Sequence, residues 1–133
     1  ALDVARKNAR QHKAAKRIQF LQADLLKGLN GPFNLIVSNP PYISMEEWAT
    51  LAPDVKDYEP ALALNDGASG LKIIERILQD APAKLAPEGA LLIEIGAGQG
   101  AATLKLAQKY CPLLRFEIKQ DLARRDRLLV GRF

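Results

Sequence analysis

Apolar side chains fall in two patterns along this chain, short unbroken runs and a longer stretch with helical spacing. Residues 33–38 (Phe-Asn-Leu-Ile-Val-Ser) and 90–95 (Ala-Leu-Leu-Ile-Glu-Ile) are short runs rich in branched side chains. Such runs are typical of buried strands in a parallel sheet. Between them, apolar positions recur every three or four residues and predict a helix with one buried face. These positions are Leu71, Ile74, Leu78, Ala81 and Leu85.

Prolines and polar residues interrupt these patterns. Pro82 lies inside the helical spacing, where it should kink the helix or begin its final turn, and residues 87–89 (Pro-Glu-Gly) should end it. Residues 43–66 have mixed polarity and several turn-forming residues. We therefore expect an irregular excursion there, with one short helix near residues 45–51.

The N-terminal part predicts a helix and a strand. Residues 1–16 are rich in Ala, Lys and Arg, which favour a helix. Residues 17–23 alternate partly between apolar and polar side chains, as a strand that ends at Asp24 would.

The C-terminal part predicts a helix and a pair of strands. The helix follows the glycine-rich residues 96–100 and continues to about Tyr110. Residues 113–119 and 127–133 predict two strands joined by a charged return with no helix, so these strands should be antiparallel. The alternation of strands and helices predicts an α/β fold with a mostly parallel sheet and this antiparallel pair at its C-terminal end.

The composition agrees with one folded domain. Hydrophobic residues make up 48% and charged residues 26% of the 133 residues, which excludes a disordered or collagen-like chain. The longest apolar runs are too short to cross a membrane, and the single cysteine, Cys111, cannot form an internal disulfide. We expect a cytoplasmic protein. Its net charge of +4 is slight for strong binding of nucleic acid.

The strongest functional candidate is the Asn-Pro-Pro-Tyr turn, formed by Asn39, Pro40, Pro41 and Tyr42 directly after residues 33–38. Ligands of open α/β sheets bind beyond the carboxyl ends of the strands. There, the side-chain oxygen of Asn39 and a carbonyl oxygen beside Pro40 can accept both hydrogens of a planar NH2 group, while the Tyr42 ring stacks on it. This grip would turn the nitrogen toward an electrophile such as a sulfonium methyl group. The alternative is that the prolines only end a strand.

Two other places could bind a nucleotide-like group. Asp24 could accept a hydrogen bond from the exocyclic amine of an adenine, or it could cap a following helix. Residues 96–100 (Gly-Ala-Gly-Gln-Gly) resemble a nucleotide-binding loop, but they could equally be a tight strand-to-helix turn. Cys111 has no Cys or His partner at metal-ligand spacing, so we expect no metal site.

Taken in order, these segments resemble the protein-(glutamine-N5) methyltransferases that modify peptide chain release factors, the HemK or PrmC family. The family hallmark is residues 36–43 (Ile-Val-Ser-Asn-Pro-Pro-Tyr-Ile). The resemblance covers essentially the whole chain. Its other segments are residues 5–9, 20–25, 58–64, 67–71, 92–96, 99–100, 119–123 and 125–127.

The resemblance implies an α/β, class I S-adenosylmethionine-dependent methyltransferase (Rossmann-like) sheet with strand order 3-2-1-4-5-7-6. It implies methyl transfer from S-adenosylmethionine to the side-chain amide nitrogen of a glutamine in release factors, and thus a role in translation termination. The Asn-Pro-Pro-Tyr turn would hold that amide. Asp24, Leu25 and Asn39 would bind the cofactor, and residues 96–100 would be the turn after the fifth strand and not the cofactor loop.

The resemblance also places the family's glycine-rich cofactor loop, its ribose-binding acidic residue and an N-terminal helical domain before Ala1. We therefore expect residues 1–133 to be a partial catalytic domain that lacks the first two strands and is weakly active or inactive alone. Residues 17–23 would then lie about 10 Å from residues 33–38. This predicts direct pairing of the two strands, exchange with a second copy through the exposed sheet edge, or disorder of the N-terminal part.

Two other functions fit the same residues. An adenine amine is also a planar NH2 group, so the Asn-Pro-Pro-Tyr turn would equally suit a methyltransferase that acts on DNA or RNA. A non-enzymatic fragment, folded only as a partial or swapped assembly, is the third possibility.

Overall fold

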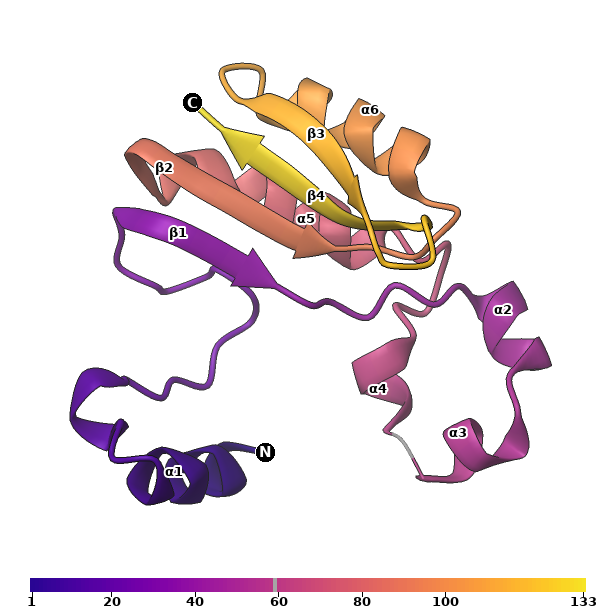
Figure 1. The fold of residues 1–133 in the computed structure, drawn as a ribbon, viewed down its shortest axis with the longest axis horizontal. Helices are drawn as coiled ribbons and strands as arrows, with labels where there is room; N and C mark the ends of the chain where they lie inside the picture. The colour runs from indigo at the N-terminus through magenta and orange to yellow at the C-terminus, as the bar shows by residue number, and fades with distance from the viewer. Residues whose placement is uncertain (59) are drawn as a thin grey trace.

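The computed structural model describes residues 1–58 and 60–133; Glu59, in one segment of the resemblance, lies outside the described residues. A four-stranded sheet forms its centre, in the order β1-β2-β4-β3 (Figure 1). The strands are β1 (Phe33–Ser38), β2 (Leu85–Glu94), β3 (Arg115–Gln120) and β4 (Asp126–Arg132). This order matches positions 4-5-7-6 of the expected class I sheet.

The sheet is mixed and mostly parallel, as predicted: β1, β2 and β3 run in one direction and β4 runs in the opposite one. Only β1 and β2 pair in parallel, whereas β4 lies antiparallel to both β2 and β3. The short return between β3 and β4 can join only antiparallel strands, and β4 inserts between β2 and β3. The predicted antiparallel C-terminal pair is confirmed.

Two helices cover one face of the sheet. In Figure 1, α5 and α6 lie behind the strands, and the opposite face is turned toward the viewer. The prediction that residues 33–38 form a buried strand is confirmed as to the strand, but only one face of it is buried. Ile36 is buried toward the helices, whereas Leu35 and Val37 on the other face are 53% and 66% exposed. The helices are α1 (Leu2–Gln11), α2 (Met45–Thr50), α3 (Pro53–Tyr58), α4 (Ala61–Leu64), α5 (Lys72–Asp80) and α6 (Gly100–Tyr110).

The helical spacing correctly predicts the core face of α5. Ile74, Leu78 and Ala81 are fully buried, and they pack with apolar residues of the sheet and of α6. Pro82 lies in a single 3-10 turn, η2 (Ala81–Ala83), which forms the predicted final turn. Leu85 does not continue the helix, because it begins β2.

β2 begins five residues earlier than predicted, at Leu85 and not at Ala90. Residues 87–89 therefore lie within the strand and do not end the helix. Between two pairings with β1, β2 advances from Leu85 to Ala90 while β1 advances only from Phe33 to Leu35. The extra residues form a bulge, with Glu88 at a φ of 63°. A proline is tolerated in a bulge, because no ladder hydrogen bond needs its missing N–H.

The predicted strand at residues 17–23 is not formed. Helix α1 ends at Gln11, and a 3-10 turn, η1 (Ala15–Arg17), is followed by irregular backbone to Ala23. A strand needs a hydrogen-bonded neighbour, and in Figure 1 this segment lies away from the free edge of β1. Direct pairing is thus absent, whereas exchange with a second copy and disorder of the N-terminal part stay predictions.

The excursion after β1 is more helical than predicted. It forms α2, α3 and α4 in place of one helix. α2 forms where the short helix was predicted. A capping box between Ser44 and Glu47 begins it at Met45: the Glu47 N–H donates to the Ser44 hydroxyl oxygen at 3.1 Å. The excursion then returns to its start, where Ile43 and Asn65 form a parallel bridge.

Candidate functional site

The Asn-Pro-Pro-Tyr turn leaves the carboxyl end of β1, as predicted, at the edge of the sheet where β2 ends and β4 begins (Figure 1). Pro40 is buried, Pro41 and Tyr42 are half-buried, and Asn39 is exposed. The turn is thus anchored in the protein at its prolines and tyrosine. Its polar side chain remains open to a ligand.

The turn lines a small cavity of about 100 Å³. The other wall comes from residues of α4, which the excursion brings back over the turn. The Ile43 N–H fixes this wall by donating to the Leu64 carbonyl at 2.9 Å. The lining residues are Asn39, Pro40, Pro41, Tyr42, Ile43, Ala63 and Leu64.

A larger apolar hollow of about 350 Å³ continues from the same turn along the excursion. Pro41 belongs to both cavities, and the outer walls include Met45, Trp48 and Leu62. Trp48 therefore lines this open hollow, although a tryptophan more commonly covers the core. The site consists of a narrow polar end and a wider apolar extension.

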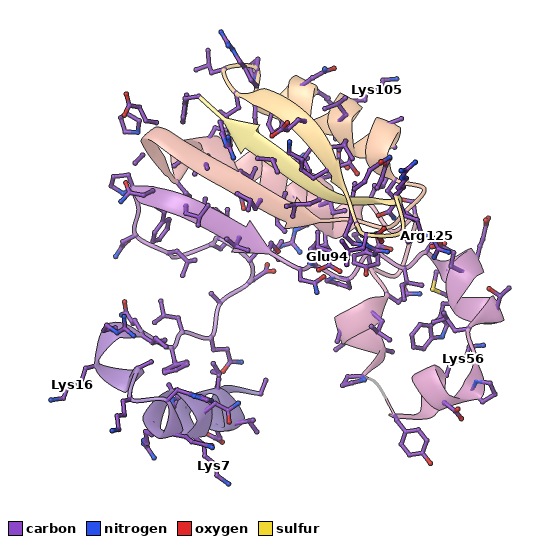
Figure 2. All side chains as sticks on the ribbon, viewed as in Figure 1. Lys7, Lys16, Lys56, Glu94, Lys105 and Arg125 are labelled. Atoms are coloured by element: carbon purple, nitrogen blue, oxygen red, sulfur yellow. The ribbon has the colours of Figure 1, made fainter. Side chains whose placement is uncertain are left out.

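The Tyr42 hydroxyl ties the turn to two strand ends. It donates a hydrogen bond to Glu94 Oε1 at 3.1 Å and accepts one from Arg127 Nη1 at 3.4 Å. Figure 2 shows Glu94 at the carboxyl end of β2. Burial raises the pKa of Tyr42, and the bond to the Glu94 carboxylate raises it further. The hydroxyl therefore stays protonated and keeps donating to Glu94.

Arg127 extends this network into the turn of the β3–β4 hairpin. Its Nη2 lies 3.4 Å from Asp121 Oδ2. The backbone N–H groups of Arg125 and Ala123 donate to the same carboxylate at 3.0 and 2.9 Å and lower the pKa of Asp121, with a smaller contribution from Arg127. Arg125 lies at the same end of the sheet as Glu94 (Figure 2). A charged chain thus runs from the hairpin turn to Tyr42.

Asp24 and Leu25, the predicted cofactor residues, begin a turn and not a helix, so Asp24 caps none. Asp24 Oδ2 accepts a hydrogen bond from Arg76 Nη2 of α5 at 2.6 Å, and it lies 3.5 Å from Lys27 Nζ. The hydrogen bond from Arg76 is the main cause that lowers the pKa of Asp24. Both cations meet the same oxygen, so Oδ1 is left as an acceptor.

The structure brings Leu25, but not Asp24, to the carboxyl end of β1. Leu25 and Ser38, the residue before Asn39, line one cavity of about 240 Å³. Its remaining walls are aliphatic, from the turn, β1 and α5. A flat apolar ring would fit such walls, whereas Asp24 does not line this cavity.

Three residues of the site were not predicted from the sequence: Glu94, Gln99 and Arg127. Glu94 lies near the end of the apolar residues 90–95, and Arg127 directly precedes the apolar residues 128–130. A charge next to a buried strand is the signal that could have found them. Gln99 lies in the glycine-rich residues 96–100, and its amide contacts the Tyr42 carbonyl at 2.8 Å. That segment thus supports the Asn-Pro-Pro-Tyr turn.

The described residues contain no group of three or more His, Cys, Asp or Glu side chains that could hold a metal ion. In the same part of the chain, no helix has the length and apolar character needed to span a membrane.

The comparisons with known proteins agree with the resemblance. A family model described as "Methyltransferase small domain" matches residues 1–53. The release factor glutamine methyltransferase of Cereibacter sphaeroides is 43% identical over 132 residues, which is 99% of this chain and 47% of that protein. The one of Nitratidesulfovibrio vulgaris is 40% identical over 135 residues, 99% of this chain and 46% of that protein. The chain therefore spans about half the length of the curated relatives it matches.

Two solved structures show the fold. TrmN from Thermus thermophilus has a TM-score of 0.62 at 20% identity, over 98% of this chain and 32% of that one. The release factor-specific protein-(glutamine-N5) methyltransferase from Alicyclobacillus acidocaldarius has a TM-score of 0.50 at 24% identity, over 75% and 48%. The fold is that of the class I methyltransferases, as predicted.

Proposed function

We propose that this protein, whose resemblance to the release factor glutamine methyltransferases is confirmed over nearly the whole chain, methylates the side-chain amide nitrogen of a glutamine in a peptide chain release factor. One observation carries the proposal. The Asn-Pro-Pro-Tyr turn lies at the carboxyl end of β1, with Asn39 exposed over a small cavity. Because release factors act in translation termination, we place the protein in the cytoplasm.

The turn would act by orienting the amide. Asn39 Oδ1 and the Pro40 carbonyl oxygen accept the two N–H groups, so that the nitrogen lone pair faces the incoming methyl carbon. S-adenosylmethionine supplies an electrophilic methyl group on a sulfonium. A nitrogen–carbon bond forms as the sulfur–carbon bond breaks, and the amide nitrogen then releases one proton to solvent. No strong base is needed, because the proton leaves after transfer.

The chain's own residues fit the adenine part of that cofactor. We assign the aliphatic walls around Leu25 to the ring and, as the resemblance implies, Asp24 to its amine. Arg76 and Lys27 would hold Oδ2 of this carboxylate and keep it ionised. Asn39 would be shared between the cofactor and the substrate, since it follows Ser38 of the same cavity.

Methylation of an adenine amine in DNA or RNA is the second candidate. An adenine amine would fit the Asn-Pro-Pro-Tyr turn as a side-chain amide does, but the similarity to release factor glutamine methyltransferases supports the amide. The net charge of +4 is also slight for phosphate binding.

A methyl-transfer assay on the full-length protein tests the proposal, with radiolabelled S-adenosylmethionine and either release factor or DNA as acceptor. We expect label in the factor. Asn39→Ala should reduce transfer about 100-fold or more, because the amide loses a fixed acceptor. Calorimetric affinity for the cofactor should change little.

Asn34→Ala is the matched control, because Asn34 is an exposed asparagine on β1, the strand that leads to the turn. It should retain normal transfer. Label in DNA with an unmodified factor would replace the first function by the second. Full activity of Asn39→Ala would contradict the role of Asn39.

A further inference from the structure

One glutamine connects three separate segments at the candidate site. Gln99 Nε2 donates to the Tyr42 carbonyl at 2.8 Å and to the Gly70 carbonyl at 3.2 Å. Gln99 Oε1 accepts from the Gly96 N–H at 2.9 Å. The end of the Asn-Pro-Pro-Tyr turn, the segment before α5 and the β2–α6 turn therefore meet on one amide.

The orientation of this amide is determined by its partners. A backbone N–H can only donate and a carbonyl can only accept. Oε1 must therefore face Gly96, and both Nε2 hydrogens must face the carbonyls of Tyr42 and Gly70. No flipped amide would satisfy the three partners.

Two glycines make room for the same side chain. Gly70 has a φ of +80°, and a Cβ there would overlap the Tyr42 carbonyl oxygen and lie 2.6 Å from Gln99 Nε2. A Cβ on Gly96 would lie 3.1 Å from Gln99 Oε1. These glycines allow the backbone to approach the glutamine, a use different from binding a phosphate.

Helix capping does not explain these contacts. Gln99 occupies the N-cap position of α6, but its side chain makes no capping hydrogen bond to the helix. All three of its hydrogen bonds go to backbone outside the helix.

We infer that Gln99 is a positioning residue for methyl transfer; this inference rests on the proposed function. Gln99 holds the carbonyl of Tyr42, while Glu94 and Arg127 hold its hydroxyl. With Tyr42 fixed at both ends, the preceding prolines keep Asn39 Oδ1 and the Pro40 carbonyl at the spacing that one NH2 group needs. A displacement of about 1 Å at such a site can reduce the rate about 100-fold.

The test compares variants of the full-length protein by kcat and KM for release factor, cofactor affinity and Tm. Gln99→Leu removes all three hydrogen bonds. We expect its kcat to fall about 10- to 100-fold, with cofactor affinity within about threefold of wild type. Gln108→Leu is the control, an exposed glutamine on α6 that should retain wild-type kcat.

Gln99→Glu keeps the shape but turns a donor into an acceptor that faces two carbonyls. Protonation of this glutamate restores one donor, so its activity relative to wild type should rise several-fold as the pH falls from neutral toward 5.5. A merely structural role would lower Tm without producing this pH profile. This variant also keeps the inference testable if Gln99→Leu does not fold.

Two results would overturn the inference: a kcat of Gln99→Leu within twofold of wild type, or a pH profile of Gln99→Glu parallel to that of wild type. Wild-type activity is measured first. If wild type labels DNA and not the factor, the proposed function fails, and the same variants are compared on DNA to decide the role of Gln99.

Discussion

At the scale of single residues, the site combines one free side chain with several fixed ones. Asn39 is exposed, whereas the hydroxyl and the carbonyl of Tyr42 both have partners in the protein. Such an arrangement suits a binding group, because the acceptor remains available while hydrogen bonds at Tyr42 hold the turn that carries it. In the core, close contacts between side chains and backbone leave no room for an added methyl group.

Gly131→Ala should destabilise the protein. Gly131 lies opposite Phe116 in the β3–β4 pair, and an added Cβ would overlap the Phe116 ring. Overpacking of this kind costs about 1 to 3 kcal/mol, which urea unfolding would measure. Gly98→Ala is the control, since its Cβ would meet no atom within 4 Å. Equal stabilities of the two variants would contradict the packing argument.

The buried thiol of Cys111 should make stability depend on pH in the alkaline range. Burial raises the pKa of Cys111 from 9.0 to about 11. The unfolded chain therefore loses this proton first, so the contribution is complete below about pH 9 and is lost as the pH rises toward 11.

Urea unfolding at pH 8 and pH 10.5 measures this effect. Wild type should lose about 2 kcal/mol more than Cys111→Ala, which has no thiol to ionise. An identical pH dependence in the two proteins would show that the thiol ionises as readily in the folded state as in the unfolded chain.

At the scale of elements, local patterns predicted the parts that pack against a covered face. The spacing of apolar residues identified the buried side of α5, and branched runs identified β1 and the later half of β2. The errors occurred where a partner decides the conformation. The alternation at residues 17–23 is compatible with a strand but has no neighbour to pair with, and residues 87–89 form a bulge only because β1 lies beside them.

The packing of α5 predicts the effect of truncating its core face. Leu78 is fully buried among sheet residues and α6. Leu78→Ala should lower the free energy of unfolding by about 2 to 5 kcal/mol, because it removes apolar contacts and leaves a cavity. Leu62→Ala is the matched control, at a leucine that is 89% exposed. A loss of stability as large in the control would contradict the assignment of the core.

At the scale of the whole molecule, the sheet has one covered and one open face. α5 and α6 cover one side, and β1 has a free edge among the described strands (Figure 1). Leu35 and Val37 stand exposed on the open face of this edge strand. Exposed apolar edges are prone to pair with other chains. That residues 1–133 are a partial domain stays a prediction, and so does self-association through this edge.

We expect the chain to self-associate more as its concentration rises. Val37→Lys should weaken this association, because it places a charge on the open face. Sedimentation equilibrium over the same concentration range measures it. Leu122→Lys is the control, since Leu122 is fully exposed in the hairpin turn, away from the edge. A monomeric wild type, or equal association of both variants, would contradict the prediction.

The sequence by itself determined the α/β class, the core face of α5, the antiparallel C-terminal pair and the place of the Asn-Pro-Pro-Tyr turn after a strand. All of these depend on residues near one another in the chain, where spacing and turn chemistry act directly. Only the tertiary structure decided the partners of Tyr42, because Glu94, Gln99 and Arg127 lie 52, 57 and 85 residues away from it. Hydrogen bonds over such separations exist only when the strand order brings the ends of β1, β2 and β4 to one edge of the sheet.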